Sequence, residues 1–168
     1  MKKTDLYYPD HTILSVLQQV STIAIVGISN SWKRPSNFVM NYMQKKGYRV
    51  LPINPKYTGS TILNEKVYSS LSECSEPVDM VDIFRPNNEI PNIAKEAVEN
   101  KDRLGIKVFW MQLGLINMEA HQITLDSGMT VIMNRCPKIE FGRLSGELGW
   151  GGVNTGVVTA KRYGLLKK

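Results

Sequence analysis

The segment Thr22–Ser36, with the sequence TIAIVGISNSWKRPS, decides the fold of this 168-residue chain. It begins with a short apolar run, Ile23–Val26, and then reaches Gly27, so a buried strand is predicted to end in a sharp turn. Pro35 disfavours helical geometry at the residue before it, and Ser36 is a suitable N-cap, so a helix is predicted to follow. This strand–loop–helix pattern is typical of nucleotide-binding domains, but the later glycines of a dinucleotide fingerprint are absent.

The other apolar runs of the chain predict a parallel sheet. They alternate with segments of helical periodicity, and they are apolar throughout, which suits strands covered on both faces. With right-handed crossovers they predict an α/β fold, namely a Rossmann-like, doubly wound, three-layer domain whose parallel five-stranded sheet has the order 3-2-1-4-5. The predicted strands are Thr22–Val26, Arg49–Ile53, Met80–Phe84, Lys107–Met111 and Thr130–Met133.

We expect a single domain with an extension at each end. Residues 1–20 are expected to form an N-terminal helical extension, because Asp10–Val20 has the apolar spacing of a helix. Residues 21–143 form the Rossmann-like domain. Residues 144–168 are rich in glycine and are expected to form an arm that packs on the domain or on a dimer mate. A second interpretation is that this arm covers the ligand.

Composition and charge argue against several classes of protein. No apolar run approaches the about 20 residues of a membrane span, and the first ten residues lack the apolar core of a secretory signal. We therefore expect a cytoplasmic protein that is not bound to a membrane. The net charge is +6, but the basic residues are scattered and do not interleave with aromatic ones, which argues against nucleic acid as a partner.

Cysteine and histidine are sparse. Cys74, Cys136, His11 and His121 are far apart in the sequence, so neither a disulfide framework nor a metal site is expected. A monomer or a homodimer would suit this composition, and a protein partner of unidentified kind is left open.

The ends of the predicted strands nominate a binding site, because ligands of open parallel sheets bind at the carboxyl ends of the strands. After the first strand, Gly27 allows the backbone to approach a ligand closely. The start of the following helix supplies free N–H groups, and Ser29, Arg34 and Ser36 add side-chain donors, a combination suited to phosphate. The alternative is a solvated loop whose serines only cap turns.

The end of the second predicted strand argues against NAD. An NAD site usually has an acidic residue there, whereas this chain has Asn54, Pro55 and Lys56. An ammonium group near the ribose suits a ligand that carries a phosphate on that ribose, such as NADP or coenzyme A. The alternative is that these three residues only form a turn, with Lys56 in water.

Residues at the ends of the next two strands extend the candidate site. Phe84, Arg85 and Pro86 are suited to border an adenine or a pantetheine chain, although Phe84 also suits the core and Arg85 the surface. Gln112 is a polar residue at the predicted mouth of the crevice. These positions follow from the strand-end rule, without any catalytic motif.

Catalytic groups are scarce in this sequence. Neither a nucleophile elbow nor a P-loop motif occurs. Cys136 is the nucleophile candidate, and Arg135 beside it would lower its pKa. Asp82 is expected to be a hydrogen-bonded structural carboxylate.

Several of these stretches together resemble a known family. The segments IAIVGISNSWKRPSNFVMNYMQKKGYRVLPINPKYTG, VDMVDIFRP, VFWMQLG and NRCPKIE resemble the small stand-alone CoA-binding proteins, whose domain is similar to the CoA-binding domain of the succinyl-CoA synthetase α subunit. The resemblance implies that the Rossmann-like domain binds coenzyme A with its phosphates over the first loop. With Gln112 from the strand-end rule, the predicted cofactor-binding residues are Gly27, Ile28, Ser29, Arg34, Ser36, Asn54, Pro55, Lys56, Phe84, Arg85, Pro86 and Gln112.

The resemblance implies binding of coenzyme A or an acyl-CoA without catalysis, in a carrier, sensor or regulatory role. The catalytic phosphohistidine of the synthetase belongs to a second, ligase domain, which is not expected in a chain of this length, and His121 is not assigned to that role. The alternative is an enzyme on the same fold, either NADP-dependent or acyl-CoA-processing, with Cys136 as its thiol.

Overall fold

Five parallel strands form the centre of the computed structural model, which describes residues 6–146. Their positions agree with the five predicted runs to within a residue at each end. The agreement follows because strands buried on both faces of a sheet appear in the sequence as apolar runs. A two-stranded ribbon, β3 (Thr61–Ile62) and β4 (Glu65–Lys66), lies outside this sheet. The sheet strands are β1 (Thr22–Val26), β2 (Arg49–Ile53), β5 (Met80–Ile83), β6 (Val108–Met111) and β7 (Thr130–Ile132).

The order of the strands differs from the prediction. It is β2-β1-β5-β6-β7, so the third strand in sequence lies beside the first and not beyond the second. The outer edge of β2 is occupied by Tyr68, whose N–H donates to the carbonyl of Pro52 at 3.0 Å. The carboxylate of Asp79, just before β5, instead accepts from the N–H groups of Ser21 and Thr22 at 2.8 and 2.9 Å. These bonds hold β5 beside β1, and the predicted order 3-2-1-4-5 is wrong for this reason.

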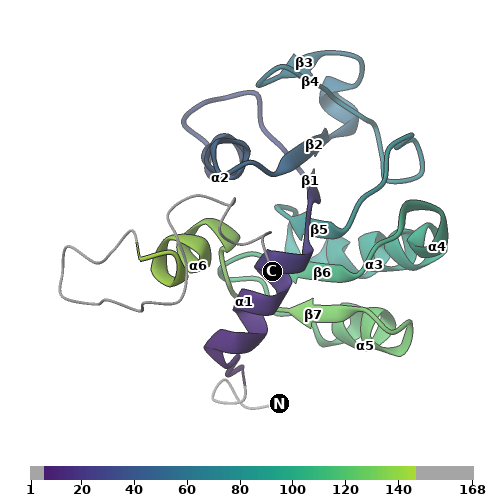
Figure 1. Cartoon of the computed structure of the whole chain (residues 1–168). Helices are drawn as coiled ribbons and strands as arrows, with labels where there is room; N and C mark the ends of the chain where they lie inside the picture. The colour runs from purple at the N-terminus through teal and green to yellow at the C-terminus, as the bar shows by residue number, and fades with distance from the viewer. Residues whose placement is uncertain (1–5, 147–168) are drawn as a thin grey trace.

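Helices cover both faces of the sheet (Figure 1). One face carries α1 (Asp10–Gln19), α2 (Pro35–Lys45) and α6 (Pro137–Leu144). The other face carries α3 (Ile90–Glu99) and α5 (Met118–Asp126), with the short α4 (Lys101–Leu104) following α3. Short 3-10 turns occur at residues 55–57 and 87–89. The three-layer arrangement of the prediction is therefore confirmed.

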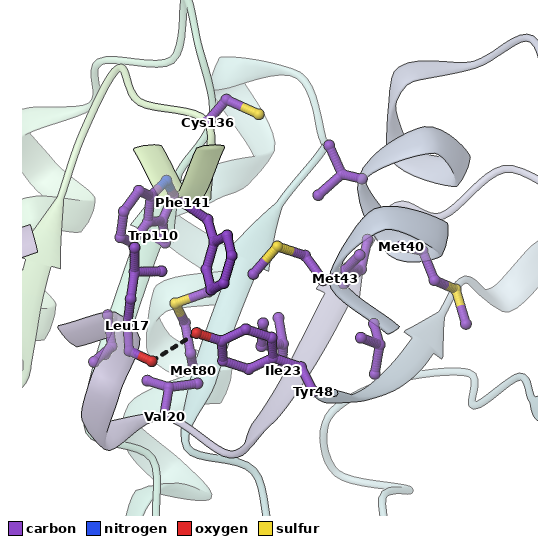
Figure 2. Packing of buried hydrophobic residues seen from close by; sticks show 14 of the residues in the cluster. Leu17, Val20, Ile23, Met40, Met43, Tyr48, Met80, Trp110, Cys136 and Phe141 are labelled. Carbon is purple, nitrogen blue, oxygen red and sulfur yellow. Dashed lines mark hydrogen bonds between the residues drawn. The ribbon is translucent and has the colours of Figure 1, made fainter. Parts of the chain in front are cut away.

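The core on the α1, α2 and α6 side joins all three helices to the sheet. Figure 2 shows Phe141 of α6 among residues of the other elements, close to Met43 of α2 and Tyr48. The hydroxyl of Tyr48 donates to the carbonyl of Leu17 in α1 at 2.6 Å. The N-terminal helix thus shares one core with the sheet.

The start of α2 tests the predicted N-cap. The helix α2 begins at Pro35, with Arg34 as the N-cap residue, so the predicted cap at Ser36 is wrong. Proline is favoured at the first position of a helix because it has no N–H to leave unpaired. Of the predicted arm at residues 144–168, Leu144 is the last residue of α6, and residues 147–168 lie outside the described residues. Within residues 6–146, no helix combines the length and the apolar character that crossing a membrane requires.

Candidate functional site

The observed strand order brings three predicted loops to one edge of the sheet. The strand β1 lies between β2 and β5, so the segments that follow these strands meet at their carboxyl ends. The direction of strand succession reverses between β1 and β5, which is the place where open α/β sheets bind ligands. The segment starting at Gly27 therefore lies between Asn54 on one side and Arg85 on the other.

Gly27 is required by the close approach of the chain after β5. Its φ is +95°, a conformation that L side chains rarely adopt. A Cβ atom at this position would lie 2.5 Å from the carbonyl oxygen of Phe84 and 2.7 Å from Cδ of Arg85. The glycine therefore allows the loops after β1 and β5 to lie against each other.

The loop between β1 and α2 is held by the first turn of that helix. The hydroxyl of Ser36 accepts a hydrogen bond from the N–H of Ser29 at 3.0 Å. The side-chain amide of Asn37 donates to the carbonyl of Ser29, also at 3.0 Å. Both side chains are buried. The backbone of Ser29 is thus fixed through both of its polar groups.

The same loop presents unused hydrogen-bond donors. Among the described residues, no acceptor lies within bonding geometry of the N–H groups of Asn30, Trp32 and Ser36. The hydroxyls of Ser29 and Ser31 accept from the N–H groups two residues later, at 3.1 and 3.4 Å, and so keep their own protons available. This arrangement has the donors that an anion at a helix start needs.

Arg34 stands at the N-cap position of α2, where its side chain is exposed. Within residues 6–146 this guanidinium makes no ion pair. It therefore adds an uncommitted cation to the donors of the loop.

The residues after β2 divide between structural and exposed positions. The side-chain amide of Asn54 donates to the carbonyl of Ile28 at 2.8 Å, and its oxygen accepts from the N–H of Lys56 at 3.0 Å. Pro55 and Lys56 are exposed in the turn that follows. The ammonium of Lys56 lies 5.5 Å from the centre of the Tyr57 ring.

Ile28 and Asn54 both have a role in the fold. The side chain of Ile28 is fully buried in the core, so its predicted place in the ligand loop concerns its backbone and stays a prediction. Both polar ends of the Asn54 amide are occupied within the protein. The two residues fix the spacing between the loops after β1 and β2.

Arg85 lies between two cavities. A small one, of about 170 Å³, extends from Gly27 toward Asn54 and Ser70. A larger one, of about 550 Å³, lies on the other side and also includes Phe84. The guanidinium of Arg85 donates to both carboxylate oxygens of Glu89, at 2.8 and 2.9 Å. Pro86 is exposed at the start of the turn that follows.

Gln112 lies in the wall of the larger cavity and contacts a buried acid. Its Nε2 donates to both oxygens of Asp82, at 3.0 Å each. Burial raises the pKa of Asp82 to about 8, and the hydrogen bond from Gln112 lowers it in part. The prediction of a hydrogen-bonded structural carboxylate at Asp82 is confirmed.

The proposed activation of Cys136 by Arg135 is wrong. Burial raises the pKa of the Cys136 thiol, and the charge of Asp82 raises it further. The guanidinium of Arg135 is turned elsewhere, donating to the carbonyls of Asn134 and Leu6 at 2.8 and 3.0 Å. Cys136 lines the larger cavity as a protonated thiol.

Several residues of the site were not predicted from the sequence. Asn37 carried a recoverable signal, because an amide side chain in the first turn of a helix often bonds to the preceding loop. Ser69 and Ser70 line the smaller cavity, but they come from a segment without periodicity. Apart from the predicted Phe84, the apolar wall of the larger cavity comes from α2, the segment after β6 and α6, and these residues are Pro35, Phe38, Val39, Leu113, Leu115 and Ile139.

Comparison with known proteins gives a family match over the same part of the chain. A family model described as "CoA binding domain" matches residues 21–142. The chain is 40% identical over 127 residues to the uncharacterized protein YneT of Bacillus subtilis (strain 168), which covers 76% of this chain and 90% of that protein. The strand-end residues described above all lie within the matched range.

Two further similarities show how far the match extends. The structure of a hypothetical protein from Pyrococcus horikoshii OT3 has a TM-score of 0.76 at 32% identity, covering 86% of this chain and 99% of that one. An ADP-forming acetate–CoA ligase of Methanocaldococcus jannaschii is 26% identical over 84 residues, which are 50% of this chain and 12% of the ligase. The chain therefore corresponds to a small part of that enzyme.

Proposed function

The chain belongs to the CoA binding domain family, and from this premise we propose that it binds coenzyme A or an acyl-CoA at the carboxyl ends of β1, β2 and β5. The protein performs no catalysis of its own and acts as a carrier, a sensor or a regulatory subunit. The succinyl-CoA synthetase-like character of the domain supports this assignment, because such a domain holds the CoA while other domains carry the chemistry.

The position of Arg85 is the observation that carries the proposal. This residue borders both cavities and lies against Gly27, where the donor-rich loop begins. A ligand with a pyrophosphate in its middle and a bulky group at each end matches this arrangement. Coenzyme A has that form, with adenosine on one side of the pyrophosphate and pantetheine on the other.

The loop between β1 and α2 supplies the phosphate contacts. The N–H groups of Asn30, Trp32 and Ser36, which find no acceptor within residues 6–146, donate to the pyrophosphate together with the hydroxyls of Ser29 and Ser31. These donors act where the dipole of α2 also favours an anion. The exposed Arg34 adds a positive charge beside them.

The adenosine end lies on the side of the smaller cavity. Pro55 borders the base and ribose there, and Ser69 and Ser70 form the opposite wall. Lys56 follows directly and is exposed, so its ammonium reaches the phosphate on the ribose. The pantetheine chain then runs past Arg85 and Phe84 toward Gln112.

The state of Cys136 favours binding over thiol catalysis. An acyl-transferring cysteine needs a thiolate, whereas burial raises the pKa of this thiol. The family match likewise supports coenzyme A and gives no support to NADP. The protein therefore holds the ligand without forming a covalent bond to it.

Thermal shift measurements with four ligands test this proposal. Coenzyme A and acetyl-CoA should raise the melting temperature of the full chain, whereas NAD and NADP at the same concentrations should not, because binding to the folded state stabilises it. Mass spectrometry of the purified protein should find a co-purified CoA compound. Stabilisation by NADP without stabilisation by coenzyme A would overturn the proposal and favour the enzyme alternative.

A further inference from the structure

The larger cavity has an apolar mouth that the coenzyme alone does not explain. Phe38 of α2, Leu113 after β6 and Ile139 of α6 are 48%, 56% and 49% exposed, although each is a large apolar side chain. They surround an opening of about 550 Å³, which lies within the range of small-molecule sites. Large apolar side chains gathered at such an opening indicate an apolar ligand.

The charged side chains of this cavity are directed to partners within the protein. Arg85 forms its two hydrogen bonds with Glu89. The ammonium of Lys138 lies 5.3 Å from the centre of the Tyr42 ring. The charge of Arg85 is therefore balanced by Glu89, and the ammonium of Lys138 lies toward Tyr42, which is not among the residues that line this cavity.

The polar part of the wall is also unsuited to a negatively charged group. Gln112 presents its amide to the cavity, and the donor end of that amide is already bonded to Asp82. The Gln112 oxygen remains, and it is an acceptor that repels a carboxylate. The cavity therefore combines an apolar mouth with a Gln112 amide whose donor end is already bonded within the protein.

We propose that this cavity holds the acyl group of an acyl-CoA, and that the acyl group is uncharged and aliphatic. The inference rests on the proposed function, because the coenzyme part must occupy the strand-end crevice for its thioester to reach the cavity. Arg85 borders both cavities, so the two sites are adjacent. The ligand class is thus a short fatty-acyl thioester and not a thioester of a dicarboxylic acid.

Calorimetric titration of the full chain with a series of CoA compounds tests this inference. Burial of one CH₂ group is worth about 0.8 kcal/mol, which corresponds to about fourfold in Kd. We therefore expect Kd to fall by up to about fourfold for each added CH₂ from acetyl-CoA through butyryl-CoA to hexanoyl-CoA. Succinyl-CoA, which has the chain length of butyryl-CoA and a terminal carboxylate, should bind at least tenfold more weakly than butyryl-CoA.

The outcomes separate this inference from the proposed function. Equal Kd values for coenzyme A and all acyl-CoAs, or tighter binding of succinyl-CoA than of butyryl-CoA, would overturn the acyl assignment and leave CoA binding intact. If no member of the series binds, both proposals fail.

A substitution at the mouth localises the effect. Ile139→Asp places a carboxylate in the first turn of α6, where the helix dipole tolerates it, so the fold should persist. This variant should raise the Kd of hexanoyl-CoA about tenfold and leave the Kd of coenzyme A within twofold of the wild-type value. Met118→Asp is the matched control, because Met118 is 43% exposed in the first turn of α5 and outside the cavity.

A second variant tests the same mouth in case the added charge of Ile139→Asp disturbs folding. Phe38→Ser removes apolar surface from the mouth without adding a charge, and it should reduce the preference for hexanoyl-CoA several-fold. Unchanged preference in both variants, with unfolding transitions like that of the wild type, would overturn the assignment.

Discussion

The amide of Gln112 donates from Nε2 to both carboxylate oxygens of Asp82, at 3.0 Å each. Asp82 is fully buried in β5, and Gln112 directly follows the neighbouring strand β6. Burial raises the pKa of the Asp82 carboxyl to about 8, because the charged form loses its hydration. The folded protein therefore holds a proton on Asp82 at pH values where the unfolded chain has released it.

This pKa predicts that Asp82 makes stability fall as pH rises. Between about pH 4 and pH 8 the folded state binds one proton more than the unfolded state. The contribution of Asp82 to the free energy of unfolding is therefore complete below pH 4 and is lost as pH approaches 8. The slope should reach about 1.4 kcal/mol for each pH unit. Urea unfolding of the wild type and of Asp82→Asn, at intervals from pH 5 to pH 9, measures it.

The asparagine variant isolates this group from the other titrating residues. Its side chain keeps the shape of Asp82 and still accepts from Gln112, but it binds no proton. The free energy of unfolding of the variant minus that of the wild type should grow with pH and become constant above about pH 8. A difference that is independent of pH would show that the pKa of Asp82 is not raised.

Gly27→Ala should cost much more stability than Gly59→Ala. Both glycines have positive φ, at +95° and +79°, so both variants carry the backbone strain of about 1 kcal/mol or more. At Gly27 the new Cβ also meets the carbonyl oxygen of Phe84 at 2.5 Å, whereas at Gly59 it meets no atom of another described residue beyond its chain neighbours within 4 Å. We expect a loss of about 3 kcal/mol at Gly27 and about 1 kcal/mol at Gly59 in urea unfolding. Equal losses would mean that the loops after β1 and β5 separate easily.

The strands were predictable from the sequence because their burial on both faces leaves an uninterrupted apolar run. Their order was not, because it depends on contacts between distant residues. Tyr68 occupies the outer edge of β2, and Asp79 bonds to the N–H groups of Ser21 and Thr22. Neither contact leaves a periodic signal.

The site was partly predictable for the same reason. Any strand order brings the carboxyl ends of parallel strands to one edge, so Gly27, Arg85 and Gln112 could be nominated without knowing it. Side-chain direction could not be predicted, and the burial of the Ile28 side chain in the core was not foreseen. The apolar mouth of the larger cavity was missed because its residues come from three elements that the sequence separates.

Ser36→Ala should weaken coenzyme A binding several-fold with a modest loss of stability. The variant removes the hydroxyl that accepts from the N–H of Ser29 at 3.0 Å. The loop between β1 and α2 then keeps only the hydrogen bond from Asn37 to the carbonyl of Ser29 as a side-chain bond to that residue. A net loss of about 1 kcal/mol of unfolding free energy is expected for one such hydrogen bond. Calorimetric titration and urea unfolding measure the two effects.

Ser127→Ala is the matched control for the loop variant. Its hydroxyl donates to the carbonyl of Thr124 at 2.7 Å, at the end of α5. It should lose comparable stability and keep the wild-type Kd for coenzyme A. A Kd that changes equally in both variants would show that the loop anchor has no specific role in binding.

Lys56→Ala should weaken the binding of coenzyme A more than the binding of dephospho-CoA, because dephospho-CoA lacks the phosphate on the ribose. The ammonium of Lys56 is exposed, so its ion pair with that phosphate is worth up to about 1 kcal/mol, or about fivefold in Kd. Lys66→Ala is the matched control, since Lys66 is also exposed and lies 5.6 Å from the ring centre of Tyr68, much as Lys56 lies 5.5 Å from that of Tyr57. Calorimetric titration at two salt concentrations should show a wild-type preference for coenzyme A that shrinks at high salt and is absent in Lys56→Ala. If Lys56→Ala weakens both ligands equally, Lys56 does not contact the ribose phosphate, and the adenosine end must lie elsewhere along the crevice.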